Sequence, residues 1–256
     1  MAFALVGAYG TPSQGASGAS VTPAWGAGAN RTAGNLLVLT FAVTGVTTAP
    51  TVTAGWIGGA VGSGASCYAA IYYKVASGGD AAPTVNGVAS GVISAQLAEY
   101  SGQAAGDPKD GGSASTQSTT SPVTTTLPQI DASAGELLIM VGADKRSTAR
   151  ASNDTWTSNR GTPTLTGSNN GVTSTEHYSF GAILSTNSNA NADTATMTLS
   201  VTTNITGLFI IALAFKLPPQ IISPSAIASA ESFGTATLVA TAPTYSQLIR
   251  GTAGLV

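Results

Sequence analysis

The sequence feature that most constrains this fold is a two-residue period in its hydrophobicity. Between residues 194 and 201, apolar side chains alternate with hydroxyl-bearing ones, which would place four of them on one face of a strand: Ala195, Met197, Leu199 and Val201. Residues 36–43 and 209–215 are nearly continuous apolar blocks, which is typical of strands at the centre of a sandwich or pressed against a neighbour. β-Branched residues, Gly and Thr dominate elsewhere. The pattern therefore predicts an all-β protein.

The sequence also repeats its own order of motifs, which predicts two similar halves. Residues 33–38 (Ala-Gly-Asn-Leu-Leu-Val) are echoed by residues 134–139 (Ala-Gly-Glu-Leu-Leu-Ile), and Trp56 and Trp156 follow the two motifs at similar intervals. An aromatic strand and a closing apolar strand come next in each copy. Neither copy alone would bury its apolar face, so we predict one β-sandwich or jelly roll. Its pseudo-repeats would cover about residues 20–102 and 120–216, with a Ser/Thr-rich stretch at 102–128 crossing between them.

The composition changes after Lys216, which predicts the end of the sandwich. Leu217-Pro218-Pro219 removes two hydrogen-bond donors from any strand ladder, so we place one sandwich domain over residues 1–216. Residues 217–256 carry no long apolar alternation, and we expect an extended, Pro-containing C-terminal arm. Its apolar side chains need a partner surface, on the chain's own sandwich or on a neighbouring subunit. We expect four of them to form an assembly interface: Ile227, Phe233, Leu238 and Ile249.

The scarcity of charge excludes several classes of function. Only 8% of the 256 residues are charged and the formal net charge is −2, so charge repulsion does not prevent folding. Binding of nucleic acid requires clustered cations, and with nine basic against eleven acidic residues we expect no nucleic-acid partner. The one local excess, at Lys145, Arg146, Arg150 and Arg160, is interpreted as a solvated loop. No apolar run reaches the roughly 18 residues of a membrane-spanning helix, so we also expect no membrane partner.

The residues that could support catalysis are few. The single cysteine, Cys67, is expected to be a small buried hydrophobe, and the single histidine, His177, lies in a strand pattern with no Gly-x-Ser-x-Gly motif in the chain. We expect the acidic residues to lie singly in turns or loops, with Asp107 and Asp110 in one turn and Asp193 in a polar turn that fits no EF-hand. We therefore predict no catalytic residues, no metal and no cofactor.

Several short motifs, taken in order, resemble a β-sandwich module of tailed-bacteriophage virion proteins and some bacterial surface proteins. They are 34–38 (Gly-Asn-Leu-Leu-Val), 72–74 (Tyr-Tyr-Lys), 98–102 (Ala-Glu-Tyr-Ser-Gly), 107–108 (Asp-Pro) and 135–138 (Gly-Glu-Leu-Leu). Residues 227–235 (Ile-Ala-Ser-Ala-Glu-Ser-Phe-Gly-Thr) are similar to a segment that recurs in phage tail and other virion proteins. The resemblance implies an assembly role on a phage particle, in head or tail, and it brings no catalytic residues with it.

These observations predict a non-enzymatic structural component of a bacteriophage particle, either a capsid decoration protein or a tail or collar protein. Its expected partners are other virion proteins and copies of itself, and its expected place is the virion surface. The N-terminal residues after Met1 have neither the basic residues nor the long apolar run of a secretory signal. This favours a protein that leaves the cell within a particle. The alternative is an adhesion module that binds host-surface carbohydrate through Trp56 or Trp156, although tryptophans at matching places in two copies are more typical of core packing.

Overall fold

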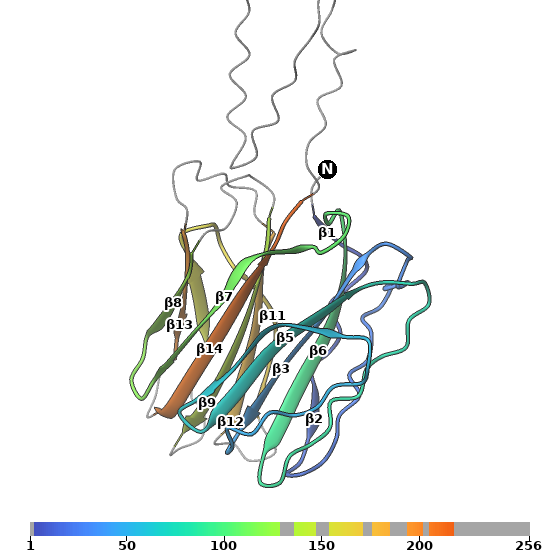
Figure 1. The fold of residues 1–256 in the computed structure, drawn as a ribbon. Helices are drawn as coiled ribbons and strands as arrows, with labels where there is room; N and C mark the ends of the chain where they lie inside the picture. The colour runs from blue at the N-terminus through green and yellow to red at the C-terminus, as the bar shows by residue number, and fades with distance from the viewer. Residues whose placement is uncertain are drawn as a thin grey trace, which may run out of the picture. The chain divides into compact units, whose positions relative to one another are not determined.

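The computed structural model describes residues 3–128, 136–146, 154–170, 176–184, 194–201 and 205–217. These residues form strands β1 to β14 and no helix, which confirms the predicted all-β class (Figure 1). Met1–Pro219 is one compact unit. The predicted C-terminal arm falls, from residue 218 onward, outside the described residues.

The strands form three antiparallel sheets. The N-terminal sheet has the order β1 (Ala4–Leu5), β6 (Val92–Ser101), β3 (Leu36–Thr44), β5 (Cys67–Val75) and β4 (Ile57–Gly64), and β2 (Ser13–Gly15) also pairs with β6. The central sheet has the order β11 (Thr164–Asn170), β12 (Glu176–Leu184), β9 (Leu137–Arg146), β14 (Ile205–Phe215) and β7 (Lys109–Ser118). The outer sheet has the order β10 (Thr155–Ser158), β13 (Thr194–Ser200) and β8 (Val123–Pro128).

The central sheet is covered on both faces, which explains the continuous apolar blocks in the sequence. On β9, Ile139 and Val141 pack with side chains of the N-terminal sheet, while Leu138 and Met140 pack with side chains of the outer sheet. β14 divides its side chains in the same way. In Figure 1, β8 and β13 flank one side of β14, β9 and β12, and β3, β5 and β6 flank the other. Two cores therefore share the central sheet.

Two other sequence patterns, the alternation at residues 194–201 and the apolar block at residues 36–43, also have a structural explanation. The alternation at residues 194–201 is confirmed, because Ala195, Met197 and Leu199 are buried against the central sheet. The far face of the N-terminal sheet is covered by loops, which pack Val21 and Val85 against β3. For this reason β3 is buried along its whole length, although none of the sheets in the described residues covers this face.

The stretch at residues 102–128 was expected to cross between the two halves, and the structure places two strands in it that were not expected. It contains β7, which forms an edge of the central sheet, and β8, which belongs to the outer sheet. Both strands contain several Ser and Thr residues on exposed positions and few apolar ones, so the sequence pattern did not identify them as strands. The outer sheet itself was not expected.

The predicted repeat of two halves has a counterpart in the order of the strands. The two echoed motifs lead into β3 and β9, and the local orders are β6-β3-β5-β4 and β14-β9-β12-β11. The two tryptophans, however, are not placed alike, since Trp56 precedes β4 whereas Trp156 lies in β10 of the outer sheet. Two copies of one motif, and the jelly-roll topology, stay predictions.

A buried hydroxyl joins the N-terminal and central sheets. Tyr178 of β12 is fully buried, and its hydroxyl donates to the carbonyl oxygen of Val92 on β6 at 2.7 Å. Its oxygen lies 2.9 Å from the hydroxyl of Thr44 on β3, which therefore donates to it. One side chain thus connects three strands across the interface between two sheets.

Replacing this hydroxyl should weaken the contact between the sheets. We expect Tyr178→Phe to lower the free energy of unfolding by about 1–3 kcal/mol, because two buried polar groups lose their partner. Urea denaturation would measure the change. Tyr72→Phe is the matched control, since that half-buried tyrosine lies on the loop-covered face and should change stability by no more than about 0.5 kcal/mol. Equal effects from the two variants would contradict the assigned role of Tyr178.

Candidate functional site

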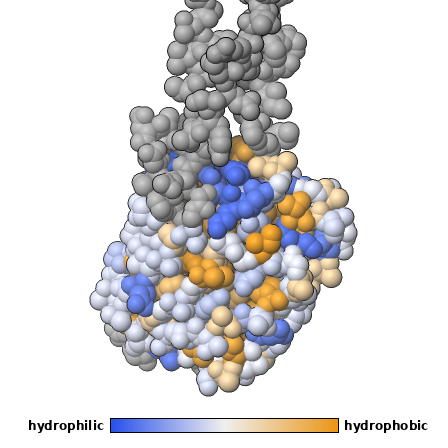
Figure 2. All heavy atoms as spheres, viewed as in Figure 1, coloured by the Kyte–Doolittle hydropathy of each residue, from blue (hydrophilic) through white to orange (hydrophobic). Residues whose placement is uncertain are grey.

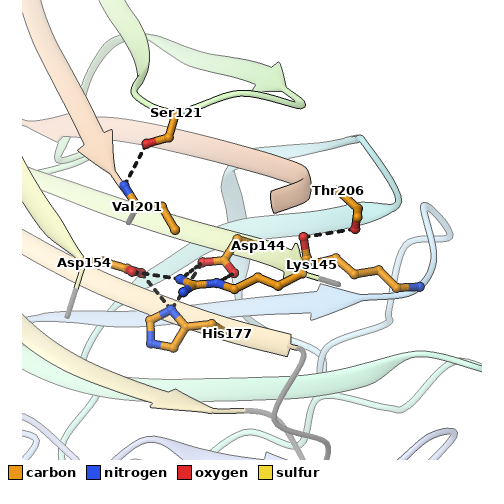
Figure 3. A network of polar contacts seen from close by, with 8 residues as sticks. Ser121, Asp144, Lys145, Asp154, His177, Val201 and Thr206 are labelled. Carbon is orange, nitrogen blue, oxygen red and sulfur yellow. Dashed lines mark hydrogen bonds and ion pairs between the residues drawn. The ribbon is translucent and has the colours of Figure 1, made fainter. Parts of the chain in front are cut away.

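The densest group of chemically active side chains lies where β9 and β12 meet the outer sheet. Asp144 and Arg146 come from the end of β9, and His177 comes from β12, where it is the register partner of Asp144. Asp154 lies immediately before β10. Figure 3 shows Asp144, Asp154 and His177 pointing toward one another. We call these four residues the charged cluster.

Short contacts connect all four members of the charged cluster. Arg146 donates from Nε to Asp144 Oδ1 at 2.5 Å and from one terminal nitrogen to Asp144 Oδ2 at 2.9 Å. The same terminal nitrogen donates to Asp154 Oδ1 at 3.0 Å. His177 Nδ1 lies 2.7 Å from Asp154 Oδ2 and 3.4 Å from Asp144 Oδ2. The guanidinium therefore bridges the two carboxylates, and the imidazole approaches both.

Strand alternation brings these groups to one face. On β9, residues 138, 140, 144 and 146 face the outer sheet, whereas residues 139, 141 and 143 face the N-terminal sheet. Lys145 falls between Asp144 and Arg146, and its side chain extends away from the charged cluster in Figure 3. Its carbonyl oxygen accepts from the Thr206 hydroxyl of β14 at 3.1 Å. A period of two thus separates the buried charges from the lysine next to them.

The charged cluster is buried, and its charges balance. Each member is at most 5% exposed. Two carboxylates face one guanidinium and one imidazole, so the group is neutral when His177 is protonated. Burying charges is costly unless each is paired and hydrogen-bonded, and here each carboxylate has two cationic neighbours.

The surroundings shift two pKa values in ways that favour the charged forms. Burial alone would lower the pKa of His177, but hydrogen bonds to Asp144 and Asp154, together with their charges, raise it above its usual value. Burial alone would raise the pKa of Asp144, but hydrogen bonds from Arg146 and His177 hold it below its usual value. Both shifts favour the ionised forms of His177 and Asp144.

Metal binding is one chemistry that this geometry suggests. Asp144, Asp154 and His177 each offer one ligand atom, and these atoms lie within 4.8 Å of one another. The guanidinium of Arg146 already donates to both carboxylates. A metal ion bound by the same carboxylates would lie next to the positive charge of Arg146. Binding of a metal ion would therefore require the Arg146 side chain to move away from the carboxylates. We therefore interpret the group as an ion-paired network in which Arg146 takes the place of a metal.

Acid–base catalysis is a second chemistry to consider. The pairing of His177 Nδ1 with Asp154 resembles the way a carboxylate orients the histidine of a Ser-His-Asp triad. Ser179, two residues along the same strand, is 1% exposed and accepts a hydrogen bond from the indole Nε1 of Trp156 at 2.7 Å. These groups lie in the interior, between two sheets. The predicted lack of catalysis stays a prediction, and the geometry favours a structural role for His177.

Trp156 packs in the core between the central and outer sheets, and two glycines leave space for its ring. A Cβ atom on Gly142 would lie 2.5 Å from Leu199 and 3.2 Å from the indole, and one on Gly181 would lie 3.3 Å from the indole. Both glycines face the outer sheet, on β9 and β12. Their missing side chains let the indole lie close to the central sheet, with its N–H directed to Ser179.

The structure corrects the interpretation of the local basic excess as a solvated loop. Arg146 and Arg160 are buried, at 3% and 2% exposure. Lys145 is half-buried on β9, and Arg150 lies outside the described residues. The signal that could have revealed Arg146 is its spacing from Asp144, because opposite charges two residues apart in a strand lie on the same face.

The expectation that acidic residues lie in turns or loops is wrong for four of the described ones, because Glu99, Asp110, Asp144 and Glu176 lie in strands β6, β7, β9 and β12. Glu99 has no exposed surface. Glu99 accepts from the backbone N–H groups of Arg31 and Thr32 at 2.7 and 2.8 Å, and from the side-chain amide of Asn35 at 2.7 Å. This carboxylate holds the loop that leads into β3. The sequence pattern did not reveal this role, because two of the three donors are backbone groups and all three lie more than 60 positions before Glu99 in the chain.

Other expectations have simple outcomes. Asp107 forms the expected turn by accepting from the Lys109 backbone N–H at 3.0 Å, whereas Asp110 belongs to β7. Cys67 is fully buried as expected, and burial, followed by the charge of Asp144, raises the pKa of its thiol to about 12. Asp193 lies outside the described residues. The expected assembly residues Ile227, Phe233, Leu238 and Ile249 also lie outside them.

Comparison of the sequence with protein families and curated proteins, and of the fold with solved structures, finds no match. Within the described ranges of the chain, no helix has the length and apolar character needed to cross a membrane.

Removing the guanidinium should expose the cost of the buried carboxylates. We expect Arg146→Met to lower the free energy of unfolding by about 3–5 kcal/mol, because Asp144 and Asp154 would lose the guanidinium that bridges them. Denaturant unfolding would measure it. Lys145→Met is the control at the adjacent position and should change stability by about 0.5 kcal/mol or less. A small effect of Arg146→Met would show that the network is not needed for folding.

The histidine should make stability depend on pH. Its pKa in the folded state lies above the usual 6.5, so its stabilising charge is fully present below about pH 6.5 and is lost as pH rises through the folded-state pKa. We therefore expect His177→Gln to lower the melting temperature more at pH 6 than at pH 9. Ser179→Ala, a buried change without a titrating group, should lower it about equally at both. A His177→Gln effect that does not vary with pH would contradict the assigned ion pairing.

Proposed function

We propose that this protein is a non-enzymatic structural component of a bacteriophage particle, on the surface of the virion, as a capsid decoration protein or a tail or collar protein. It assembles with other virion proteins and with copies of itself, through the sandwich and the C-terminal arm. The sequence resemblance to virion β-sandwich modules is one support for this role.

The observation that carries the proposal is that the reactive side chains are buried. His177, Asp144, Asp154, Arg146 and Cys67 are all at most 5% exposed. The first four connect β9, β12 and the segment before β10 by ion pairs and hydrogen bonds with one another. Their charged groups therefore serve contacts inside the fold. This arrangement favours a protein whose task is to keep its shape.

The exposed surface fits the same role. Figure 2 shows hydrophobic and strongly hydrophilic residues on one face as separate patches among residues of intermediate hydropathy. Only 8% of all residues are charged, and several of these are buried. Such a surface has little long-range field, so binding to neighbours would rest on shape and hydrogen bonds.

The carbohydrate-binding alternative loses one of its two tryptophans. Trp156 is 6% exposed and belongs to the core between the central and outer sheets, as its core-packing interpretation predicted. Trp56 is partly buried on the loop-covered face of the N-terminal sheet. A glycan array with wild-type protein and a Trp56→Ala variant would test what is left of this alternative.

The arm and the location of the protein provide the test of the main proposal. We expect mass spectrometry of purified particles to detect the protein. Deletion of residues 218–256 should leave the melting temperature of the sandwich nearly unchanged, since Met1–Pro219 is compact by itself, but should reduce incorporation into particles. Burying three or four apolar anchors, each contributing about 1.5–3 kcal/mol, would explain such a loss. Ile227→Ala and Phe233→Ala should have the strongest single effects.

Four outcomes would count against this proposal. A protein missing from purified particles would overturn the virion role. Unfolding of the truncated chain would show that residues 218–256 belong to the core. Normal incorporation of the truncated chain would remove the arm from assembly. Turnover of an ester, peptide or glycan substrate that disappears in His177→Ala would overturn the non-enzymatic part.

A further inference from the structure

Strand β4 presents an open edge of the N-terminal sheet. It pairs with β5 on one side, and in the described part of the chain no strand pairs with its other side. Along that side, an edge strand exposes backbone N–H and C=O groups that can pair with another strand. β4 is eight residues long, which is enough for a full ladder.

β4 lacks the features that usually protect an edge. Its sequence, Ile-Gly-Gly-Ala-Val-Gly-Ser-Gly, has neither a charged residue nor a proline, and one irregularity of register between Gly58 and Ala60 is its only protective device. Ile57 is 55% exposed and Val61 is 50% exposed. They are the two most exposed large apolar side chains of the described residues. The edge is therefore open, uncharged and partly apolar.

The other edges of the two larger sheets are blocked or interrupted. On β11, Gln96 donates to the carbonyl oxygen of Thr166 at 2.8 Å and accepts from its hydroxyl at 2.8 Å. β7 begins with the charged residues Lys109 and Asp110. β1 and β2, which line the far side of β6, have two and three residues. β11 is also uncharged and seven residues long, but Gln96 occupies the carbonyl oxygen and hydroxyl of its Thr166. Among these edges, β4 is the one that combines length and lack of charge without such a side-chain contact in the described residues.

Glycines hold β4 firmly in this position. A Cβ atom on Gly59 would lie 2.5 Å from Leu213, and one on Gly62 would lie 2.9 Å from Phe209, so any side chain there would push β4 away from the central sheet. Gly64 approaches Gln117 of β7 in the same way. The inner face is thus fixed by packing, and the strand offers its free edge as a preformed template.

We propose that β4 pairs antiparallel with β4 of a second copy of this chain, joining two N-terminal sheets into one continuous sheet across a two-fold axis. The lack of charge on β4 favours a second copy of the chain as the partner strand. In a two-fold pairing each strand faces its own sequence, so any charge on β4 would meet a like charge, and β4 has none. The inference deepens the proposed assembly function and rests on it for its biological setting.

The exposed valine allows a direct test in the full-length protein. We expect wild-type protein to sediment as a dimer or larger species at micromolar concentration, and Val61→Lys to weaken self-association by roughly tenfold or more, because two lysines would be brought together at the pairing. Leu165→Lys is the matched control, since Leu165 is a 41% exposed apolar residue on the edge strand β11 of the other sheet. It should associate as the wild type does. Equal melting temperatures of both variants would exclude misfolding.

Cysteine cross-linking provides a second readout that locates the contact. Cys67 is fully buried and its pKa of about 12 keeps it protonated, so it should not react. Single substitutions Val61→Cys and Ser63→Cys should then give disulfide-linked dimers under mild oxidation, whereas Leu165→Cys should not.

The outcomes separate this inference from the proposed function. A monomeric wild-type protein, unchanged association of Val61→Lys, or equal loss in Val61→Lys and Leu165→Lys would each overturn the β4 pairing. Association that requires residues 218–256 but tolerates Val61→Lys would also overturn it and assign the contact to the arm. A β4-dependent dimer that is missing from particles would support the pairing and overturn the virion role. A monomer found in particles would do the reverse.

Discussion

The physical constraint on which this structure depends is that the three inner strands of the central sheet, β12, β9 and β14, are buried on both faces along most of their length. The N-terminal sheet covers one side and the outer sheet covers the other, so side chains of both parities along β9, β12 and β14 leave water. Apolar side chains gain from this burial. Every polar side chain on these strands must instead find a partner inside the protein, because an unpaired buried group is costly. The hydroxyl of Tyr178 and the charged cluster are two solutions to this one requirement.

The two solutions lie on opposite faces of one strand. Tyr178 faces the N-terminal sheet and finds neutral partners, the carbonyl oxygen of Val92 and the hydroxyl of Thr44. His177 faces the outer sheet and finds two carboxylates. A neutral hydroxyl needs only two well-placed groups, whereas buried charges need a set that sums to zero. This difference explains why the charged cluster draws residues from β9, β12 and the segment before β10.

Much of the fold could be predicted from local pattern, and most of the charged cluster could not. The alternation at 194–201 and the apolar blocks at 36–43 and 209–215 gave correct strands, because two-residue periodicity is a property of a short segment. The Ser/Thr-rich strands β7 and β8 were missed, since their faces lack apolar contrast. The cluster depends on which strands become neighbours. Asp144 and His177 are 33 positions apart in the chain and meet only through the register of β9 with β12.

The burial of charge also changes what the outer surface can do. Of nine basic and eleven acidic residues, the structure buries at least six: Glu99, Glu136, Asp144, Arg146, Asp154 and Arg160. A chain already poor in charge thus leaves its exterior poorer still, and long-range electrostatic steering of a partner would be weak. Recognition must then come from short-range contacts, which are backbone hydrogen bonds, shape and small apolar areas. In the proposed pairing of two copies, the uncharged edge strand β4 would provide all three, because its backbone groups are available at the edge, glycines fix its inner face and Ile57 and Val61 are exposed.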